Sequence, residues 1–157
     1  MKSDTVMPTA SLQTPVGMLV VTEDNGALTR LDWKGVDNGE PSALLHEAVN
    51  QLRAYFAGTL KTFDLPLAPK GGDLHQAVFR AMSAIPYGET RTYGEIARDL
   101  DTYGQPIGQA CGANPLPVII PCHRVLSANG LGGYSGAGGL DTKIALLKLE
   151  DGYPFLV

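Results

Sequence analysis

Residues 119–126 read Ile119-Ile120-Pro121-Cys122-His123-Arg124-Val125-Leu126, which sets a cysteine and a histidine side by side behind a proline and an apolar run. The branched apolar residues predict a short buried strand over residues 118–120. Pro121 should end this strand, because proline cannot continue a ladder of backbone hydrogen bonds. Cys122 would then lie at the end of a rigid element. A thiol held there is a candidate nucleophile, and the imidazole of His123 is a candidate base.

A packing role for Cys122 is the ordinary alternative, because free cysteine often behaves as a small buried hydrophobe. Neighbouring residues of an extended segment also point to opposite faces, so His123 would need a bridging water or a third group to act on the thiol. The Cys-His pair alone therefore does not decide between the two roles.

The composition is that of an ordinary globular protein, with 44% hydrophobic and 18% charged residues. No apolar run approaches the ~20 residues that a membrane span needs, and residues 1–5 lack the features of a secretory signal. Two cysteines and three scattered histidines predict a cytoplasmic protein without a disulfide framework or a metal. The net charge of −4 counts mildly against a nucleic-acid partner, unless one face is locally positive.

Residues 1–70 predict a small α/β domain. Asn25-Gly26 between two apolar runs is a strong hairpin signal, and another strand is expected before it. Apolar residues recur every three or four positions over residues 41–57, which predicts an amphipathic helix with Pro41 in its first turn. Residues 63–67 favour a short edge strand. No candidate catalytic group lies here, so a supporting role is expected.

Residues 71–157 predict a second, mostly helical domain. Helical spacing over residues 74–85 follows a possible N-cap at Asp73. Thr92 and Glu95 form a capping box at the start of the next helix, and residues 106–113 can form a third. Two short helices joined by a tight turn are the helix-turn-helix pattern, although an ordinary helical hairpin is the commoner alternative.

The end of the chain predicts a final helix that Asp141 could cap. Glu150 falls at the end of this helix, where the helix dipole disfavours an acid. A charged or hydrogen-bonded partner would explain the position of Glu150, and simple solvent exposure is the alternative.

Several ordered motifs of the second domain closely resemble the active-site signatures of the O6-alkylguanine-DNA alkyltransferases. They are residues 85–90 (Ile-Pro-Tyr-Gly-Glu-Thr), residues 92–97 (Thr-Tyr-Gly-Glu-Ile-Ala), Asn114-Pro115 with residues 119–125, and residues 133–136 (Gly-Tyr-Ser-Gly) followed by Lys143, Leu146, Leu147 and Glu150. The resemblance covers residues 74–151 closely and the first domain only by its general pattern. Motifs in a compatible order are far more specific than the Cys-His pair alone.

The resemblance implies a ribonuclease H-like α/β domain over residues 1–70 and a winged-helix-like domain with a helix-turn-helix over residues 71–157. It also implies a substrate, double-stranded DNA that carries O6-methylguanine or a related lesion. The alkyl group would pass to Cys122 in one irreversible displacement, without a cofactor, on a protein that works as a monomer.

The resemblance implies roles for individual residues as well. His123 would take the thiol proton through a water, Glu150 would orient His123, and Asn114 would brace this network. Tyr93 would help to rotate the nucleotide out of the helix and would donate a hydrogen bond to the base. The carbonyl groups of Cys122 and Val125 and the N–H of Ser135 would read the guanine edge. Further contacts with DNA or the lesion are expected from Gly94, Gln105, Gly108, Arg124 and Tyr134.

One departure from the family pattern lies at the start of the second helix of the helix-turn-helix. The family generally has an Arg-Ala-Val-Gly run there, whose arginine enters the duplex. This chain has Gln105-Pro106-Ile107-Gly108, after a turn about two residues shorter. Gln105 can still form a hydrogen bond in the gap left by the extruded base, but it brings no positive charge.

Two other functions remain open at this stage. A protein that binds alkylated guanine without repairing it is the first, although relatives of that type replace the cysteine that Cys122 represents. A cysteine hydrolase or redox protein is the second. A hydrolase needs an oxyanion site and repeated turnover, and the Cys-x-x-Cys motif of thioredoxin-like proteins is absent from the sequence.

Overall fold

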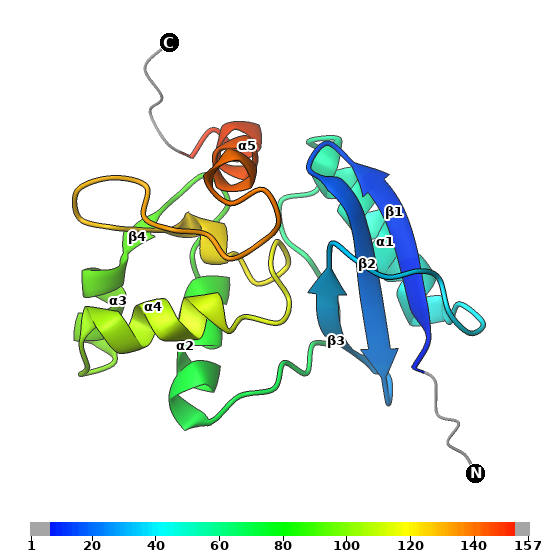
Figure 1. Cartoon of the computed structure of the whole chain (residues 1–157), viewed down its shortest axis with the longest axis horizontal. Coiled ribbons are helices and arrows are strands. Elements are labelled where there is room, and N and C mark those ends of the chain that lie inside the picture. The colour runs from blue at the N-terminus through cyan, green and yellow to red at the C-terminus, as the bar shows by residue number, and fades with distance from the viewer. Residues whose placement is uncertain (1–6, 153–157) are drawn as a thin grey trace. The chain divides into compact units, whose positions relative to one another are not determined.

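The computed structural model describes residues 7–152, which divide into two compact units (Figure 1). Unit 1 ends at Pro69, and unit 2 begins at Lys70. The boundary lies in a stretch of proline and glycine residues between the last contact of the first sheet and the next helix. Each unit has its own apolar core.

Unit 1 contains an antiparallel sheet of three strands in the order β1-β2-β3. The strands are β1 (Thr9–Thr14), β2 (Gly17–Asp24) and β3 (Ala27–Asp32). Asn25 and Gly26 connect the last two with φ angles of 52° and 80°. Both residues are thus left-handed, as a tight two-residue hairpin turn requires. The predicted hairpin and the strand before it are confirmed.

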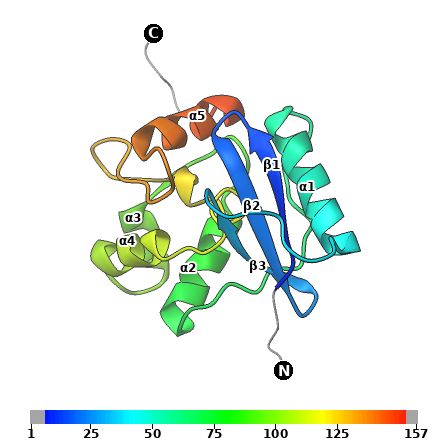
Figure 2. The same cartoon turned by 45° about the vertical axis from the view of Figure 1, so that its right-hand side comes forward.

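Helix α1 (Ala43–Phe56) covers one face of this sheet (Figure 2). Its buried residues are spaced by three or four positions, as predicted: Leu45, Ala48, Val49, Leu52 and Tyr55. The helix starts later than predicted, because the Ser42 side chain accepts a hydrogen bond from the N–H of Leu45 and so caps it. Pro41 therefore precedes the cap.

The edge strand predicted over residues 63–67 is wrong. The described contact with the sheet is a single bridge between Leu28 and Leu67. Leu28 donates its N–H to the carbonyl of Pro66 and accepts a hydrogen bond from the N–H of Ala68. Pro66 has no N–H of its own, so this parallel pairing cannot continue toward residue 64.

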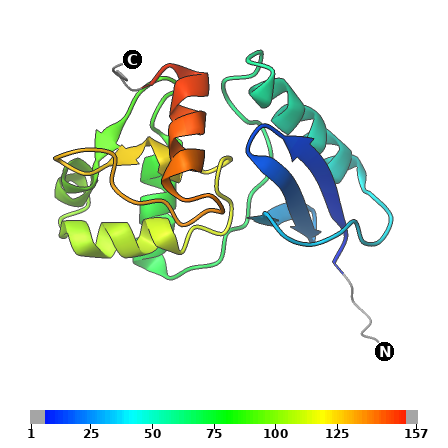
Figure 3. The same ribbon diagram turned by 45° about the horizontal axis from the view of Figure 1, so that its top comes forward.

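Unit 2 is mostly helical (Figure 3). Its helices are α2 (Asp73–Ser83), α3 (Tyr93–Asp99), α4 (Gly104–Gly112) and α5 (Leu140–Glu150). Two short parallel strands, β4 (Arg91–Thr92) and β5 (Val125–Leu126), pair between them. Helix α4 packs against both α2 and α3. The two-helix hairpin predicted from the sequence is therefore present as α3 and α4.

Three helix starts test the predicted caps of unit 2. The capping box is confirmed at α3, where Thr92 and Glu95 each accept a hydrogen bond from the other's backbone N–H. The other two caps are wrong, since Gly72 and Gly139 occupy the N-cap positions of α2 and α5. Asp73 and Asp141 lie instead in the first turns, where a carboxylate interacts favourably with the helix dipole.

Candidate active site

The segment that leads to Cys122 is a buried turn and not the predicted strand. The Asn114 side chain donates to the carbonyl of Ile120 at 2.8 Å and accepts from the N–H of Leu116 at 2.9 Å. These two bonds fold residues 114–120 back on themselves, which overrides the strand preference of the branched residues. Val118 has a φ of 73°, a conformation that costs a branched residue roughly 1–3 kcal/mol. Asn114 therefore helps to hold a strained segment in place.

Cys122 opens a short 3-10 turn, Cys122–Arg124, and lines a pocket of about 260 Å³. The wall opposite is formed by α4, whose Gly108, Cys111 and Gly112 line the same pocket. The remaining lining residues come from the start of α3 and from the glycine-rich loop: Tyr93, Gly133, Tyr134 and Ser135. Cys122 is thus buried, with 6% of its surface exposed, yet it borders a cavity.

The ring of Tyr93 is held by the glycine-rich loop. Gly132 has a φ of +74°, and a Cβ built on it would lie 3.1 Å from Cε2 of Tyr93 and 3.2 Å from the N–H nitrogen of Ser127. Any larger residue would collide with the ring or with the backbone. Gly132 therefore allows the loop to close over Tyr93.

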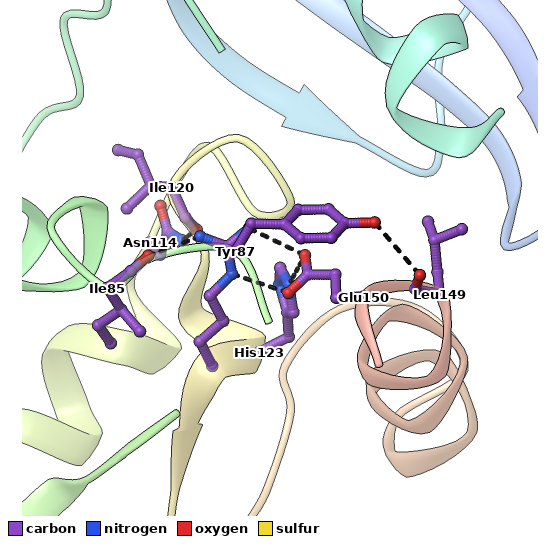
Figure 4. A network of polar contacts seen from close by, with 8 residues as sticks. Ile85, Tyr87, Asn114, Ile120, His123, Leu149 and Glu150 are labelled. Atoms are coloured by element: carbon purple, nitrogen blue, oxygen red, sulfur yellow. Dashed lines mark hydrogen bonds and ion pairs between the residues drawn. The ribbon is translucent and has the colours of Figure 1, made fainter. Parts of the chain in front are cut away.

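The two residues after Cys122 belong to a buried cluster of charged side chains around Glu150 (Figure 4). His123 Nε2 lies 2.7 Å from Oε2 of Glu150. Arg124 donates from Nε and Nη2 to the same carboxylate, at 2.8 and 3.0 Å, and from Nη1 to the carbonyl of Ile85 at 2.7 Å. The guanidinium also lies over the ring of Tyr87, 5.7 Å from its centre. Glu150 thus has the paired role that its position at the helix end suggested.

The contact with Glu150 sets the tautomer of His123. A neutral imidazole that donates from Nε2 to a carboxylate has a lone pair on Nδ1. Nδ1 is buried and makes no hydrogen bond to the described part of the chain. Burial lowers the pKa of His123, against the opposing effect of Glu150. The ring is therefore kept neutral and able to accept a proton.

The thiol of Cys122 is kept protonated at rest. Burial raises its pKa, while a hydrogen bond with Asn114 and the positive charge of Lys143 act in the opposite direction. Because the thiolate is the reactive form, a base is needed to remove the proton. The second thiol of the pocket, Cys111, has its pKa raised to about 12 by burial and contacts the Met82 sulfur at 3.5 Å.

Lys143 is a buried side chain of this region that was not among the predicted site residues. Its ammonium group donates to the carbonyls of Val125 and Gly133, at 2.7 and 2.9 Å. Burial lowers its pKa to about 8. The sequence held a signal for it, since Lys143 shares one helix face with Leu146, Leu147 and Glu150 at spacings of three, four and seven.

The structure brings most of the predicted site residues together. Those that line the pocket are Tyr93, Gly108, Cys122, Tyr134 and Ser135. The charged residues His123 and Glu150 meet behind it, Asn114 supports it, and Gly94 and Gln105 lie exposed in the first turns of α3 and α4.

Two of the predicted DNA or lesion contacts are placed differently. The Arg124 residue is 6% exposed and directs its guanidinium to Glu150 and Ile85, inside the unit. The structure therefore gives Arg124 an internal role, because the 3-10 turn carries its side chain toward α5 rather than toward the surface. The Val125 residue is fully buried, and its carbonyl accepts a hydrogen bond from Lys143.

Within residues 7–152, no helix is long and apolar enough to cross a membrane. The same residues contain no group of three or more His, Cys, Asp or Glu side chains that could hold a metal ion.

Residues 7–69 match the family model described as 6-O-methylguanine DNA methyltransferase, ribonuclease-like domain. Residues 73–152 match the model described as 6-O-methylguanine DNA methyltransferase, DNA binding domain. The chain belongs to the 6-O-methylguanine DNA methyltransferase family.

Known members of this family resemble the chain along nearly all of its length. A methylated-DNA–protein-cysteine methyltransferase of Methanosarcina acetivorans is 44% identical over 155 residues, covering 90% of this chain and 96% of that protein. The crystal structure of the Mycobacterium tuberculosis O6-methylguanine methyltransferase is 40% identical with a TM-score of 0.81, covering 95% of this chain and 96% of that one. A structure of M. tuberculosis OGT in complex with DNA has a TM-score of 0.78 at 41% identity, with coverages of 90% and 91%.

The family resemblance inferred from the motifs is therefore confirmed. So is the general fold, a ribonuclease-like α/β domain followed by a helical domain, which correspond in sequence to unit 1 and unit 2.

Proposed function

We propose that this member of the 6-O-methylguanine DNA methyltransferase family repairs double-stranded DNA by direct reversal of O6-alkylguanine. Cys122 is the acceptor of the alkyl group, and each molecule reacts once. The observation that carries the proposal is that Cys122 borders the pocket while the next residue, His123, holds a buried carboxylate. A thiol, a neutral base and an orienting acid are the parts that nucleophilic catalysis by cysteine needs.

The reaction forms one bond and breaks one. The thiol proton passes to Nδ1 of His123 through a water, and the imidazolium is stabilised by Glu150. The Cys122 sulfur attacks the alkyl carbon, the bond between this carbon and O6 breaks, and the guanine leaves with the electron pair. Tyr93 donates a hydrogen bond to the base as negative charge develops on it. The proton held by His123 then returns through water to the guanine anion, so that neutral guanine and a neutral imidazole result. The protein keeps a thioether, which cannot regenerate the thiol.

Other residues position the reactants. Asn114 braces the segment before Cys122 and forms a hydrogen bond with its sulfur. The pocket walls, including Tyr134, enclose the base, and the carbonyl of Cys122 and the N–H of Ser135 read its edge. The carbonyl of Val125 can share this task only through its second lone pair, since Lys143 already donates to it.

DNA is bound by residues 71–157, and residues 1–70 support them. Helices α3 and α4 act as the helix-turn-helix of a winged-helix-like domain, with Gly94, Gln105 and Gly108 facing the DNA. The lesion base must leave the stack to reach the buried Cys122, as is general for enzymes that act on a base. The protein acts as a cytoplasmic monomer without a cofactor.

A sensor that binds alkylguanine without repair is disfavoured by the complete set of Cys122, His123 and Glu150. A cysteine hydrolase would need an oxyanion site and repeated turnover through a thioester that water cleaves.

The test is the intact mass of the protein after incubation with a duplex that contains O6-methylguanine. One added methyl group, located on Cys122 by peptide mapping, is expected. Cys122→Ser should bind the lesion without any gain in mass. Cys111→Ser is the matched control, because this second pocket thiol is held protonated and should leave methylation unchanged. Lesion binding without a mass change in the wild-type protein would contradict repair and support the sensor.

A further inference from the structure

Tyr103 exposes its side chain more than any other large hydrophobic residue of the described chain. Its exposed fraction is 81%, whereas Ile107 and Cys111 on the same helix α4 are buried. Tyr103 is the N-cap of α4, in an extended backbone conformation and without a capping hydrogen bond from its side chain. Single exposed apolar side chains are common on protein surfaces, and Tyr103 is distinguished by its place at the start of α4, the helix that lines the pocket.

The position of Tyr103 places it beside the pocket. The next residue, Gly104, packs against Tyr93, since a Cβ on Gly104 would lie 4.0 Å from the Cβ of Tyr93. Tyr93 lines the pocket, and so do Gly108 and Gly112 on the same helix that Tyr103 caps. The exposed ring therefore stands next to the two elements that form one wall of the pocket.

The surroundings of Tyr103 suit a nucleic acid. The first turn of α4 contains no acidic residue, so its partly positive N-terminal end can face phosphate. Arg98, in the last turn of α3, is exposed, and Asp101 in the intervening turn carries the opposite charge. Gln105, in the first turn of α4, is exposed and uncharged. The electrostatic attraction for DNA at the start of α4 is therefore modest, and the ring of Tyr103 is the large apolar group exposed there.

We propose that Tyr103 inserts its ring into the base stack when the lesion nucleotide leaves it. This inference rests on the proposed function, because the gap opens when the lesion base leaves the stack to reach Cys122. A base that leaves the duplex exposes the flat faces of its neighbours, and apolar side chains can fill such spaces. Aromatic rings stack on any base. Tyr103 is thus a positioning residue, which stabilises the extruded state and does not touch the reacting atoms.

The test compares the rate of Cys122 methylation from duplex and from single-stranded DNA of the same sequence. Tyr103→Ala should slow transfer from the duplex by about tenfold or more, the typical effect of losing one stacked ring. It should leave transfer from the single strand unchanged, because no gap has to be filled there. Tyr103→Phe should keep the wild-type rate on both. Leu74→Ala, at an exposed apolar residue of α2, is the matched control and should behave as wild type.

A second measurement observes the stacking directly. The Cys122→Ser variant is mixed with a duplex that has 2-aminopurine opposite the lesion. The fluorescence of 2-aminopurine should stay quenched when the variant binds, because the ring of Tyr103 stacks in the gap. The additional change Tyr103→Ala should make the 2-aminopurine fluoresce more strongly. Thermal unfolding of each variant checks that the fold is retained.

Some outcomes would contradict the proposed role of Tyr103 without contradicting DNA repair by this protein. These are an unchanged duplex rate for Tyr103→Ala, an equal slowing on duplex and single strand, or a loss of rate in Tyr103→Phe. Failure of the wild-type protein to gain a methyl group from either DNA would instead remove the proposed function itself.

Discussion

The cores of unit 1 and unit 2 differ in the polar side chains that they contain. The described residues with buried polar or charged side chains all belong to unit 2: Asn114, His123, Arg124, Thr142, Lys143 and Glu150. The core of unit 1 is formed by apolar residues of the sheet and of α1, together with Tyr55. Burying a charge is unfavourable unless it is paired and hydrogen-bonded. The core of unit 2 therefore bears the cost of burying charged groups, and the core of unit 1 does not.

The ion pairs of the two units sharpen this difference. Arg30 and Asp32 of unit 1 form a pair at 2.8 Å with exposed side-chain fractions of 60% and 35%. Arg124 and Glu150 of unit 2 form a pair at the same distance, with 7% and 0% exposed. Although the two pairs have the same N–O distance, loss of the Arg124–Glu150 pair should destabilise the protein more, because solvent screens the Arg30–Asp32 pair and not the buried one.

The largest expected effect is that of Glu150→Gln. It leaves the guanidinium of Arg124 buried beside a neutral amide, and removal of one partner from a buried pair typically destabilises a protein by about 3–5 kcal/mol. The rate of methyl transfer should also fall, by roughly 10²–10⁴, because His123 loses the group that orients it. Urea unfolding and the rate of Cys122 methylation measure the two effects.

The matched control in unit 1 is Asp32→Asn, which should change the free energy of unfolding by only about 0–1 kcal/mol and leave methylation unaffected. If Glu150→Gln cost no more stability than Asp32→Asn, the contrast between the two units would be wrong.

The parts of this site that the sequence predicted are those that depend on local chemistry. The hairpin at Asn25-Gly26 and the capping box at Thr92 follow from backbone and side-chain bonds within a few residues. The pairing of Glu150 was suggested by an acid at the unfavourable end of a helix. For the hairpin and the capping box, the signal and the structure that it produces lie in the same short segment. For Glu150 only the signal is local, because its partners His123 and Arg124 lie far away in the sequence.

The parts that the sequence did not predict depend on side-chain contacts that override local preference. Residues 118–120 have strand propensity, but the bonds of the nearby Asn114 side chain fold them into a turn. Arg124 is a plausible DNA contact by its charge, but a 3-10 turn and the carboxylate at the far end of α5 draw it inward. The role of a side chain depends on the residues that it contacts in the folded chain, and a single sequence does not show those contacts.

The next effect in size concerns pH. The folded-state pKa of His123 is lowered by burial, so between that value and about 6.5 the unfolded chain binds the extra proton. Stability should therefore fall on acidification below about pH 6.5, with a contribution of up to about 1.4 kcal/mol per pH unit from this one group. Urea unfolding at several pH values should show a smaller acid loss in His123→Gln than in the wild-type protein.

His46→Gln supplies the comparison with unit 1, because His46 is an exposed histidine of α1. It should keep the wild-type dependence of stability on pH. Among the charged groups around His123, Glu150 raises its pKa, whereas Arg124 and Lys143 lower it as burial does. Equal curves for all three proteins would mean that Glu150 cancels the combined effect of burial and the two cations.

The smallest expected effect is on DNA binding and separates the two units by function. Gln105→Arg adds a positive charge to the exposed first turn of α4 and should tighten binding to duplex DNA. The plot of log affinity against log salt concentration should steepen by about one counterion. Gln13→Arg adds the same charge to an exposed position of β1 in unit 1. Because the proposed DNA contacts all lie in unit 2, this control should leave the slope unchanged.

A slope that steepened equally in both variants would show that only the net charge of the protein affects DNA binding. An unchanged slope in Gln105→Arg would mean that the start of α4 does not meet the phosphates, and Tyr103, two residues earlier, would then lack the contact with DNA that its proposed role requires.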